Sequence, residues 1–307
     1  MVQIGRKLAP AALASLEVNK EYIAQRRKDG RRGKIFHPGQ EDAKEVAALI
    51  AAGGVVVMPW GAESRRIMIL VGVFDNPLAT AALNEIKGRP QRQVLGIGCL
   101  PESTHYVAKT EESKPLVEAA RRLLDISNPT KDHLNQVIGL LFENNSVGLL
   151  LMAQDSLPIQ VTDAKPFGRT VLVLGASDWQ DPNDSYNNTL WELSTRYGKV
   201  VAGTSANPTG KNVYSVAAQH QLYEEIGSRV DGFVVFNKIP PKSPKIDAAA
   251  SSTVIDLTGE QPKLMRWGNQ HPLSFRRFFP DLNKPNHVNK EAHAENIVGF
   301  IKRRLTK

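Results

Sequence analysis

The residues with the clearest chemical potential follow the short apolar run Val200-Val201-Ala202. They are Gly203-Thr204-Ser205-Ala206-Asn207-Pro208-Thr209-Gly210, a stretch of small, hydroxyl and amide side chains. An apolar run that opens into such residues predicts a buried strand that delivers a polar loop. Backbone N–H groups and short donors in such a loop can approach a phosphate closely, because no bulky side chain blocks the way. On composition alone a plain turn explains the octet better, so its functional interpretation depends on companion motifs.

A pair of cations forms the second candidate group. A helical pattern over residues 78–86 ends in Lys87-Gly88-Arg89-Pro90, before an apolar run from Val94 to Leu100 that predicts a strand. Lys87 and Arg89 can converge on one anion, and the planar fork of a guanidinium fits phosphate or carboxylate. The simpler alternative is a helix C-terminus that carries two cations because they suit its dipole.

A third group lies downstream, in Ser251-Ser252-Thr253-Val254-Ile255-Asp256-Leu257-Thr258. The segment Leu264-Met265-Arg266-Trp267-Gly268 follows it after a turn. The apolar residues predict two paired strands. Arg266 is either an anion ligand or an ordinary surface arginine on a strand.

Taken in this order, the three groups resemble the motifs of the YrdC family, whose members include the threonylcarbamoyl-adenylate synthases of tRNA modification. The opening Ala47-Ala48-Leu49-Ile50-Ala51-Ala52-Gly53-Gly54-Val55-Val56-Val57-Met58-Pro59 is also similar to that family's first helix and strand. The resemblance covers residues 40–268. It implies an α/β fold in which helices cover a twisted sheet of mixed parallel and antiparallel strands, and alternation of strand and helix patterns along the chain favours the same class.

The resemblance also implies an activity. A synthase of this type joins L-threonine, bicarbonate and ATP into threonylcarbamoyl-AMP for the t6A modification of tRNA, and releases pyrophosphate. Such a step depends on positioning and on cations that offset the phosphate charge. The implied catalytic residues are Lys87 and Arg89. The implied ligands of ATP and its Mg²⁺ are Thr204, Ser205, Asn207, Ser252 and Arg266, with Ser252 on the amino acid side.

The chain departs from the family pattern where the amino acid would bind. After the first strand the family carries Pro-Thr-Asp-Thr and a Tyr-Gly-Leu segment, whereas here Pro59 is followed by Trp60-Gly61-Ala62-Glu63-Ser64-Arg65-Arg66. A further substrate arginine of the family is replaced by Gln160 in the nearest counterpart. The nucleotide half of the site is therefore expected to be kept and the amino acid half to be rebuilt or lost. The alternative function is a YrdC-fold protein that binds RNA or nucleotide without synthesis.

Positive charge gathers at both ends of the chain. The 307 residues carry a formal net charge of +8. Basic clusters of this kind can neutralise the phosphates of nucleic acid, double-stranded RNA included. The alternative is a pair of solvated tails that aid solubility. The clusters are Lys20, Arg26, Arg27, Lys28, Arg31, Arg32 and Lys34 near the start, and Arg276, Arg277, Lys302, Arg303, Arg304 and Lys307 near the end.

Composition sets the remaining expectations. The single cysteine, Cys99, excludes an internal disulfide and a cysteine-based zinc site, and its apolar surroundings predict a buried structural thiol. The seven histidines show no metal-ligand spacing. No apolar run reaches the ~18 residues of a membrane helix, so a cytoplasmic protein is expected. The predicted organisation is a basic extension over 1–38, a YrdC-like domain over 39–270 and a basic extension over 271–307.

Overall fold

The computed structural model describes residues 8–60, 67–88, 94–142, 147–175, 185–206, 216–235, 252–266 and 272–282.

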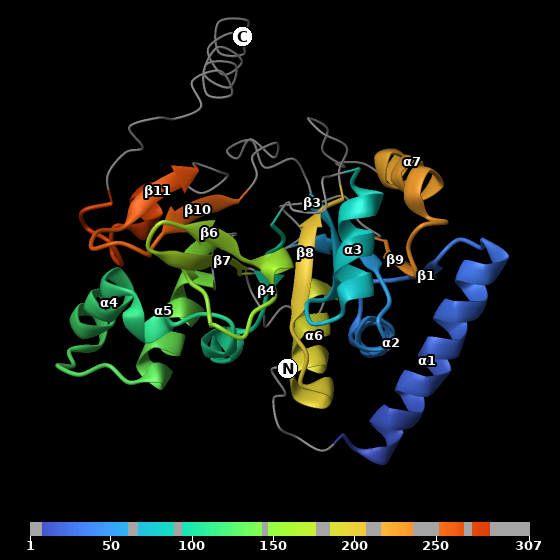
Figure 1. Ribbon diagram of the computed structural model, residues 1–307, viewed down its shortest axis with the longest axis horizontal. Helices are drawn as coiled ribbons and strands as arrows, with labels where there is room; N and C mark the ends of the chain where they lie inside the picture. The colour runs from blue at the N-terminus through green and yellow to red at the C-terminus, as the bar shows by residue number, and fades with distance from the viewer. Residues whose placement is uncertain are drawn as a thin grey trace, which may run out of the picture.

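Within these ranges a single mixed sheet runs through the molecule (Figure 1). Its strands are β1 (Lys34–Phe36), β2 (Val56–Trp60), β3 (Ile67–Val73), β4 (Gly96–Gly98), β5 (Val147–Met152), β6 (Asp163–Lys165), β7 (Gly168–Leu174), β8 (Val201–Ser205), β9 (Gly232–Val234), β10 (Thr253–Asp256) and β11 (Lys263–Arg266).

The sheet follows the order β1-β9-β2-β3-β8-β4-β7-β5-β10-β11, with β6 paired to β7 alone. Strands β1, β2, β4 and β10 each have a parallel neighbour, whereas β3 is antiparallel to both β2 and β8. This arrangement confirms the predicted fold class, a mixed α/β sheet.

Two apolar layers lie on the two faces of the sheet, because successive strand residues point to opposite sides. In β3, Met68 and Leu70 belong to one layer and Ile69 and Val71 to the other. The first layer includes residues of α3 (Pro77–Ile86), α4 (Lys114–Leu124), α5 (Lys131–Phe142) and α7 (Val216–Ile226). The second includes residues of α1 (Pro10–Asp29), α2 (Gln40–Ala51) and α6 (Ser185–Glu192), which continues as a π-helical turn over Leu193–Tyr197.

The segment over 1–38, predicted as a basic extension, contributes α1 and the edge strand β1. Local patterns did not predict β1, since its three residues become a strand only by pairing in parallel with β9, about 200 residues later. On the same segment Ala12 and Ile23 are buried in the second layer. The domain boundary at residue 38 stays a prediction, but α1 packs on α2.

A buried carboxylate fastens this segment to the rest of the chain. Asp231, whose side chain is 1% exposed, receives the guanidinium of Arg26 at 2.6 Å and that of Arg27 at 2.7 Å. Its other contact is with the backbone N–H of Val55, which donates to Oδ2 at 2.9 Å. Arg26 also donates to the carbonyls of Arg31 and Ser228, at 2.8 and 3.0 Å. Helix α1 and the residue before β2 thereby bind the same side chain, just before the start of β9.

The predicted C-terminal extension also reaches the core in its first part. Phe275, Phe278 and Phe279 are buried in the first apolar layer. Arg122 of α4 donates to the carbonyls of Arg277 and Phe278, at 2.7 Å each. Residues 272–282 therefore pack on α4, whereas the rest of the predicted extension lies outside the described residues.

Cys99 is buried, as predicted. Its Sγ lies 3.7 Å from Thr104 Oγ1, and burial raises the pKa of the thiol to about 12. The thiolate is the nucleophilic form, so a thiol with this pKa is inert near neutral pH.

We expect Arg26→Ala to be far more destabilising than Arg27→Ala. The Arg26 side chain is 3% exposed and the Arg27 side chain 41% exposed. Removing one partner of a buried ion pair costs about 3–5 kcal/mol, whereas a largely exposed partner contributes about 1 kcal/mol or less. Urea unfolding followed by tryptophan fluorescence measures both losses. Equal losses in the two variants would contradict the assigned role of Arg26.

We further expect Cys99 in the folded protein to resist alkylation by iodoacetamide at pH 8. The raised pKa keeps the thiol neutral until the pH approaches about 12. In the unfolded chain the ordinary value of ~8.5 leaves a substantial thiolate fraction at pH 8. Mass spectrometry with and without urea tests this, and rapid labelling of the native protein would show the thiol to be accessible.

Candidate functional site

The end of α3 and the end of β8 lie on the same side of the sheet, where β3 begins and β8 finishes. Asn76 caps α3, accepting from the backbone N–H of Leu78 at 3.0 Å, only three residues after β3 ends. Because the connection is short, α3 returns along the sheet toward the start of β3. Strand β8 is antiparallel to β3 and pairs Ser205 with Ile69, so β8 also ends there (Figure 1). The helix ends at Ile86 with Lys87 as its cap, which confirms the predicted helix-end position of this lysine.

The two hydroxyl residues at the end of β8 point to opposite faces of the sheet. Ala202 and Ala206 belong to the layer under α3, and Val201 to the layer under α2 and α6. By strand alternation Thr204 shares the face of α3, and Ser205 the other face. The sequence predicted a polar loop from Gly203 onward, but β8 continues through Ser205 because Thr204 and Ser205 pair with β3. Of these two hydroxyls, only that of Thr204 is therefore on the face of Lys87.

Ser252 and Arg266 are brought into direct contact. Arg266 is the last residue of β11, and its Nε donates to the carbonyl of Ser252 at 2.9 Å. Ser252 directly precedes β10, and its side chain is buried. Toward the residues that the structure describes, the terminal nitrogens of Arg266 make no further hydrogen bond. Desolvation by the surrounding chain lowers the pKa of this guanidinium, although the side chain keeps solvent contact and an arginine stays protonated in proteins.

Strand order alone separates these two groups, because β4, β7 and β5 lie between β8 and β10. The twist of the sheet changes how the end of β8 and the β10–β11 pair are oriented relative to each other. Neighbouring strands are rotated by roughly 20–25°, so four steps accumulate a turn of roughly 90°. Figure 1 shows β8 upright, with β10 and β11 to its left and tilted relative to it. The twist therefore turns the β10–β11 hairpin relative to the edge where β8 ends.

Two of the predicted residues, Arg89 and Asn207, lie outside the described residues. The same holds for Arg65 and Arg66 and for the side chain of Trp60. Residues 61–66, 89–93 and 207–215 follow β2, α3 and β8 in the chain, with at most two residues in between. The structure therefore describes the candidate site only at the ends of β2, α3 and β8, and not in the segments that follow them.

The basic cluster near the start of the chain is largely neutralised by carboxylates. Arg26 and Arg27 share Asp231, and the more exposed cations have partners of their own. The pairs are Lys20 with Glu17, Arg31 with Asp29, Arg32 with Glu224 and Lys34 with Glu45. Six of the seven cations therefore take part in ion pairs, which weakens the expectation of a phosphate-binding patch here. RNA binding itself stays a prediction.

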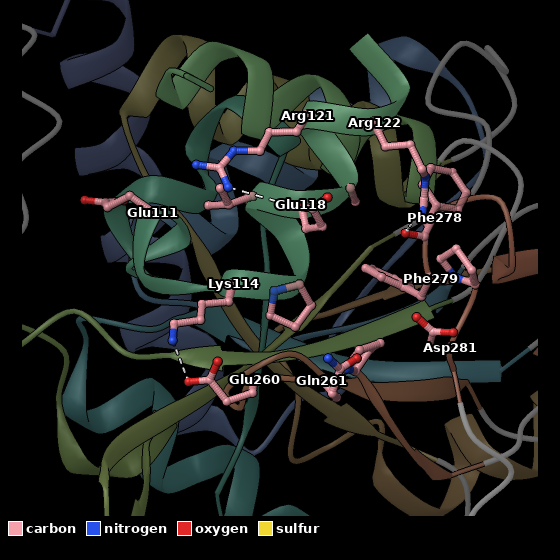
Figure 2. A pocket seen from close by; sticks show the side chains of 15 residues that line it. Glu111, Lys114, Glu118, Arg121, Arg122, Glu260, Gln261, Phe278, Phe279 and Asp281 are labelled. Atoms are coloured by element: carbon pink, nitrogen blue, oxygen red, sulfur yellow. Dashed lines mark hydrogen bonds and ion pairs between the residues drawn. The ribbon is translucent and has the colours of Figure 1, made fainter. Parts of the chain in front are cut away.

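A hollow of about 500 Å³ lies between α4, the β10–β11 turn and residues 278–281 (Figure 2). Sequence reasoning did not find it, because its walls come from distant segments. None of the predicted site residues lines the described part of this hollow. Its charges are used within the chain, since Lys114 pairs with Glu260 at 2.6 Å and Arg121 with Glu118 at 3.6 Å. The hollow is therefore separate from the candidate nucleotide site.

None of the helices in the described ranges combines the length and the apolar character needed to cross a membrane.

Comparison with protein families gives one match. The model of the Sua5, YciO and YrdC family, described as telomere recombination, matches residues 185–268. This segment includes α6, β8, α7, β9, β10 and β11. No curated protein sequence matches the chain.

Comparison with solved structures finds the same fold. A two-substitution variant of P. abyssi Sua5 is 19% identical with a TM-score of 0.56, over 82% of this chain and 65% of that one. Sua5 of P. abyssi complexed with L-threonine gives 20% identity and a TM-score of 0.54, over 81% and 62%. E. coli YciO gives 16% and 0.51, over 81% and 99%. The chain thus spans less than two thirds of the Sua5 structures that it resembles.

Proposed function

We propose that this chain, which is YrdC-like in its fold and in its matched segment, binds ATP with Mg²⁺ and forms a carbamoyl-adenylate from an amino acid. The observation that supports the proposal most is the topology that brings the end of α3, capped by Lys87, and the end of β8, with Thr204, to the same side of the sheet. L-threonine is the expected amino acid, and threonylcarbamoyl-AMP for t6A modification of tRNA the expected product.

In the proposed reaction the chain supplies positioned cations. The amine of the amino acid forms a bond to the carbon of bicarbonate, water leaves, and a carbamate results. A carboxylate oxygen of the carbamate then attacks the α-phosphorus of ATP, a new P–O bond forms, and the bond to pyrophosphate breaks. Lys87 and Arg89 offset charge on the triphosphate, which needs stabilisation most as pyrophosphate leaves. The terminal nitrogens of Arg266, held by the Ser252 carbonyl, offer a planar fork to the nucleotide.

The oxygen-rich donors at the end of β8 fit a divalent cation. Mg²⁺ prefers oxygen ligands and is commonly bound together with substrate phosphates. The hydroxyl of Thr204, on the face of Lys87, offers an oxygen of this kind, whereas the hydroxyl of Ser205 points to the other face of the sheet and is not expected to bind the same cation. The amide of Asn207, the third expected ligand, lies outside the described residues. Bound with the triphosphate, Mg²⁺ would neutralise part of its charge.

The amino acid half of the site is the weaker part of the proposal. Trp60 follows Pro59 where the family has a threonine, so the short hydroxyl that would contact the substrate is missing. This departure supports the alternative, a YrdC-fold protein that binds nucleotide or RNA without synthesis. The paired cations of the N-terminal cluster count against an RNA surface there.

Pyrophosphate release separates the two functions. The chain is incubated with ATP, Mg²⁺ and bicarbonate, with threonine or another amino acid. Release that requires an amino acid supports synthesis, and no release above the blank with any amino acid excludes it. Thermal shifts with ATP, AMP and threonine then show which ligands bind, because a ligand of the folded state raises Tm. A shift with ATP but no release favours the alternative.

We expect Lys87→Ala to weaken ATP binding by about ten- to a hundredfold. Losing one charge-assisted contact to a phosphate costs roughly 1.5–3 kcal/mol, which corresponds to that change in Kd. Arg89→Ala is expected to act similarly, and Arg89→Lys to recover only part of the loss, because an ammonium lacks the guanidinium fork.

Titration calorimetry with ATP measures these affinities, and urea unfolding checks that the fold is kept. Lys44→Ala is the matched control, since Lys44 pairs with Glu41 on α2, away from the candidate site. If both alanine variants bind ATP as tightly as the parent does, Lys87 and Arg89 only complement the dipole at the end of the helix, and the site assignment is wrong.

A further inference from the structure

Strand β1 forms an edge of the sheet and leaves one residue's backbone turned outward. Lys34 N–H donates to the Asp231 carbonyl at 3.2 Å, and Val235 N–H donates to the Phe36 carbonyl at 2.9 Å. Lys34 and Phe36 therefore face β9, and in a parallel pair the residue between them faces the other way. That residue is Ile35, and β1 ends the strand order among the described residues. Within the described part of the chain its N–H and C=O have no backbone partner, so they can pair with a further strand.

An apolar hollow lies beside this edge, between β1, β9 and α7. It measures about 290 Å³, and we call it the edge hollow. Ile35 and Val216 stand at its walls with 45% and 50% of their surface exposed. The lining residues are Ile35, Val216, Gln219, His220, Tyr223, Phe233 and Val235. Two large aliphatic side chains thus remain in water next to an open strand edge.

Gln219 places an unsatisfied hydrogen-bond donor beside the edge hollow. This side chain is 3% exposed and lines the hollow, and its Nε2 has no hydrogen-bond acceptor among the residues that the structure describes. A buried donor without an acceptor is costly, and such groups in native proteins call for an explanation. An acceptor oxygen carried by an occupant of the hollow would supply the missing partner.

The charges around the edge hollow are balanced within the chain. Arg32 pairs with Glu224 and lies over the Tyr223 ring, and Lys34 pairs with Glu45. His220 lies 3.9 Å from Glu224. The surroundings therefore offer little net charge to an occupant, which favours an uncharged one.

We propose that β1 and the edge hollow dock an extended, uncharged peptide segment of a partner protein. Its backbone pairs with the N–H and C=O of Ile35, in the manner of strand addition to a sheet edge. One of its apolar side chains fills the edge hollow between Ile35 and Val216. A carbonyl oxygen of the same segment accepts from Gln219 Nε2. An extended peptide offers all three groups together: backbone donors and acceptors, an apolar side chain and a carbonyl oxygen.

A displayed library of random octapeptides, selected on the full chain, tests the proposal. We expect the enriched peptides to share uncharged apolar residues at alternate positions. Fluorescence polarisation with a synthetic peptide of the enriched sequence then measures Kd. N-methylation of the backbone amides that would face β1 is expected to weaken binding at least tenfold, because it blocks strand pairing.

Variants locate the binding. Val216→Lys is expected to weaken it at least tenfold, and the matched control Ile159→Lys, at a side chain 76% exposed, to leave it unchanged. Gln219→Leu is expected to weaken peptide binding while keeping or raising the Tm of the free chain, a pair of effects that simple unfolding would not give. The proposal is overturned if no peptide is enriched, if N-methylated peptides bind equally well, or if Val216→Lys has no effect. Light scattering that shows dimers lost in Val216→Lys would likewise overturn it, in favour of a second copy of this chain.

Discussion

The carboxylate of Asp231 joins parts of the chain that are far apart in the sequence. It accepts from the backbone N–H of Val55 just before β2, and it receives two guanidinium groups from α1. Strand β9 starts at the next residue and pairs with both β1 and β2. The position of β9 therefore depends on a buried charge that is fully satisfied, and a charge of that kind tolerates little displacement. The positions of α1 and β1 at this edge of the sheet therefore also depend on the contacts of Asp231.

The centre of the sheet is held differently, by apolar pairing on both faces. Strand β3 lies between β2 and β8, with Met68 and Leu70 in one layer and Ile69 and Val71 in the other. The same pairing fixes where β8 ends and so where Thr204 and Ser205 lie. Because the site residues are set by core packing, their backbone is positioned by the most rigid part of the fold, and the variable segments are left to the loops that follow.

Much of the fold could be predicted where the signal is local. The helical pattern over residues 78–86 predicted α3, which ends at Ile86, and the apolar run from Val94 to Leu100 contains β4. The ion pair of Arg26 with Asp231 could not be predicted, because the two residues are 205 positions apart and a basic run is usually solvated. Of the candidate site, Lys87 was placed correctly at its helix end. The opposite orientations of Thr204 and Ser205 were missed, because they depend on where β8 stops, which is decided by its pairing with β3.

The paired arginines of α1 also affect how the protein behaves as a polyelectrolyte. Two guanidinium groups share one carboxylate, so the cluster carries a net positive charge, and Arg26 holds its share where water and counterions barely reach. The charge of Arg26 is offset by the carboxylate beside it, so the net charge of these three residues is presented to solvent through Arg27, whose side chain is 41% exposed. Counterions and acidic partners therefore meet this part of the surface as one cation, although its sequence carries two.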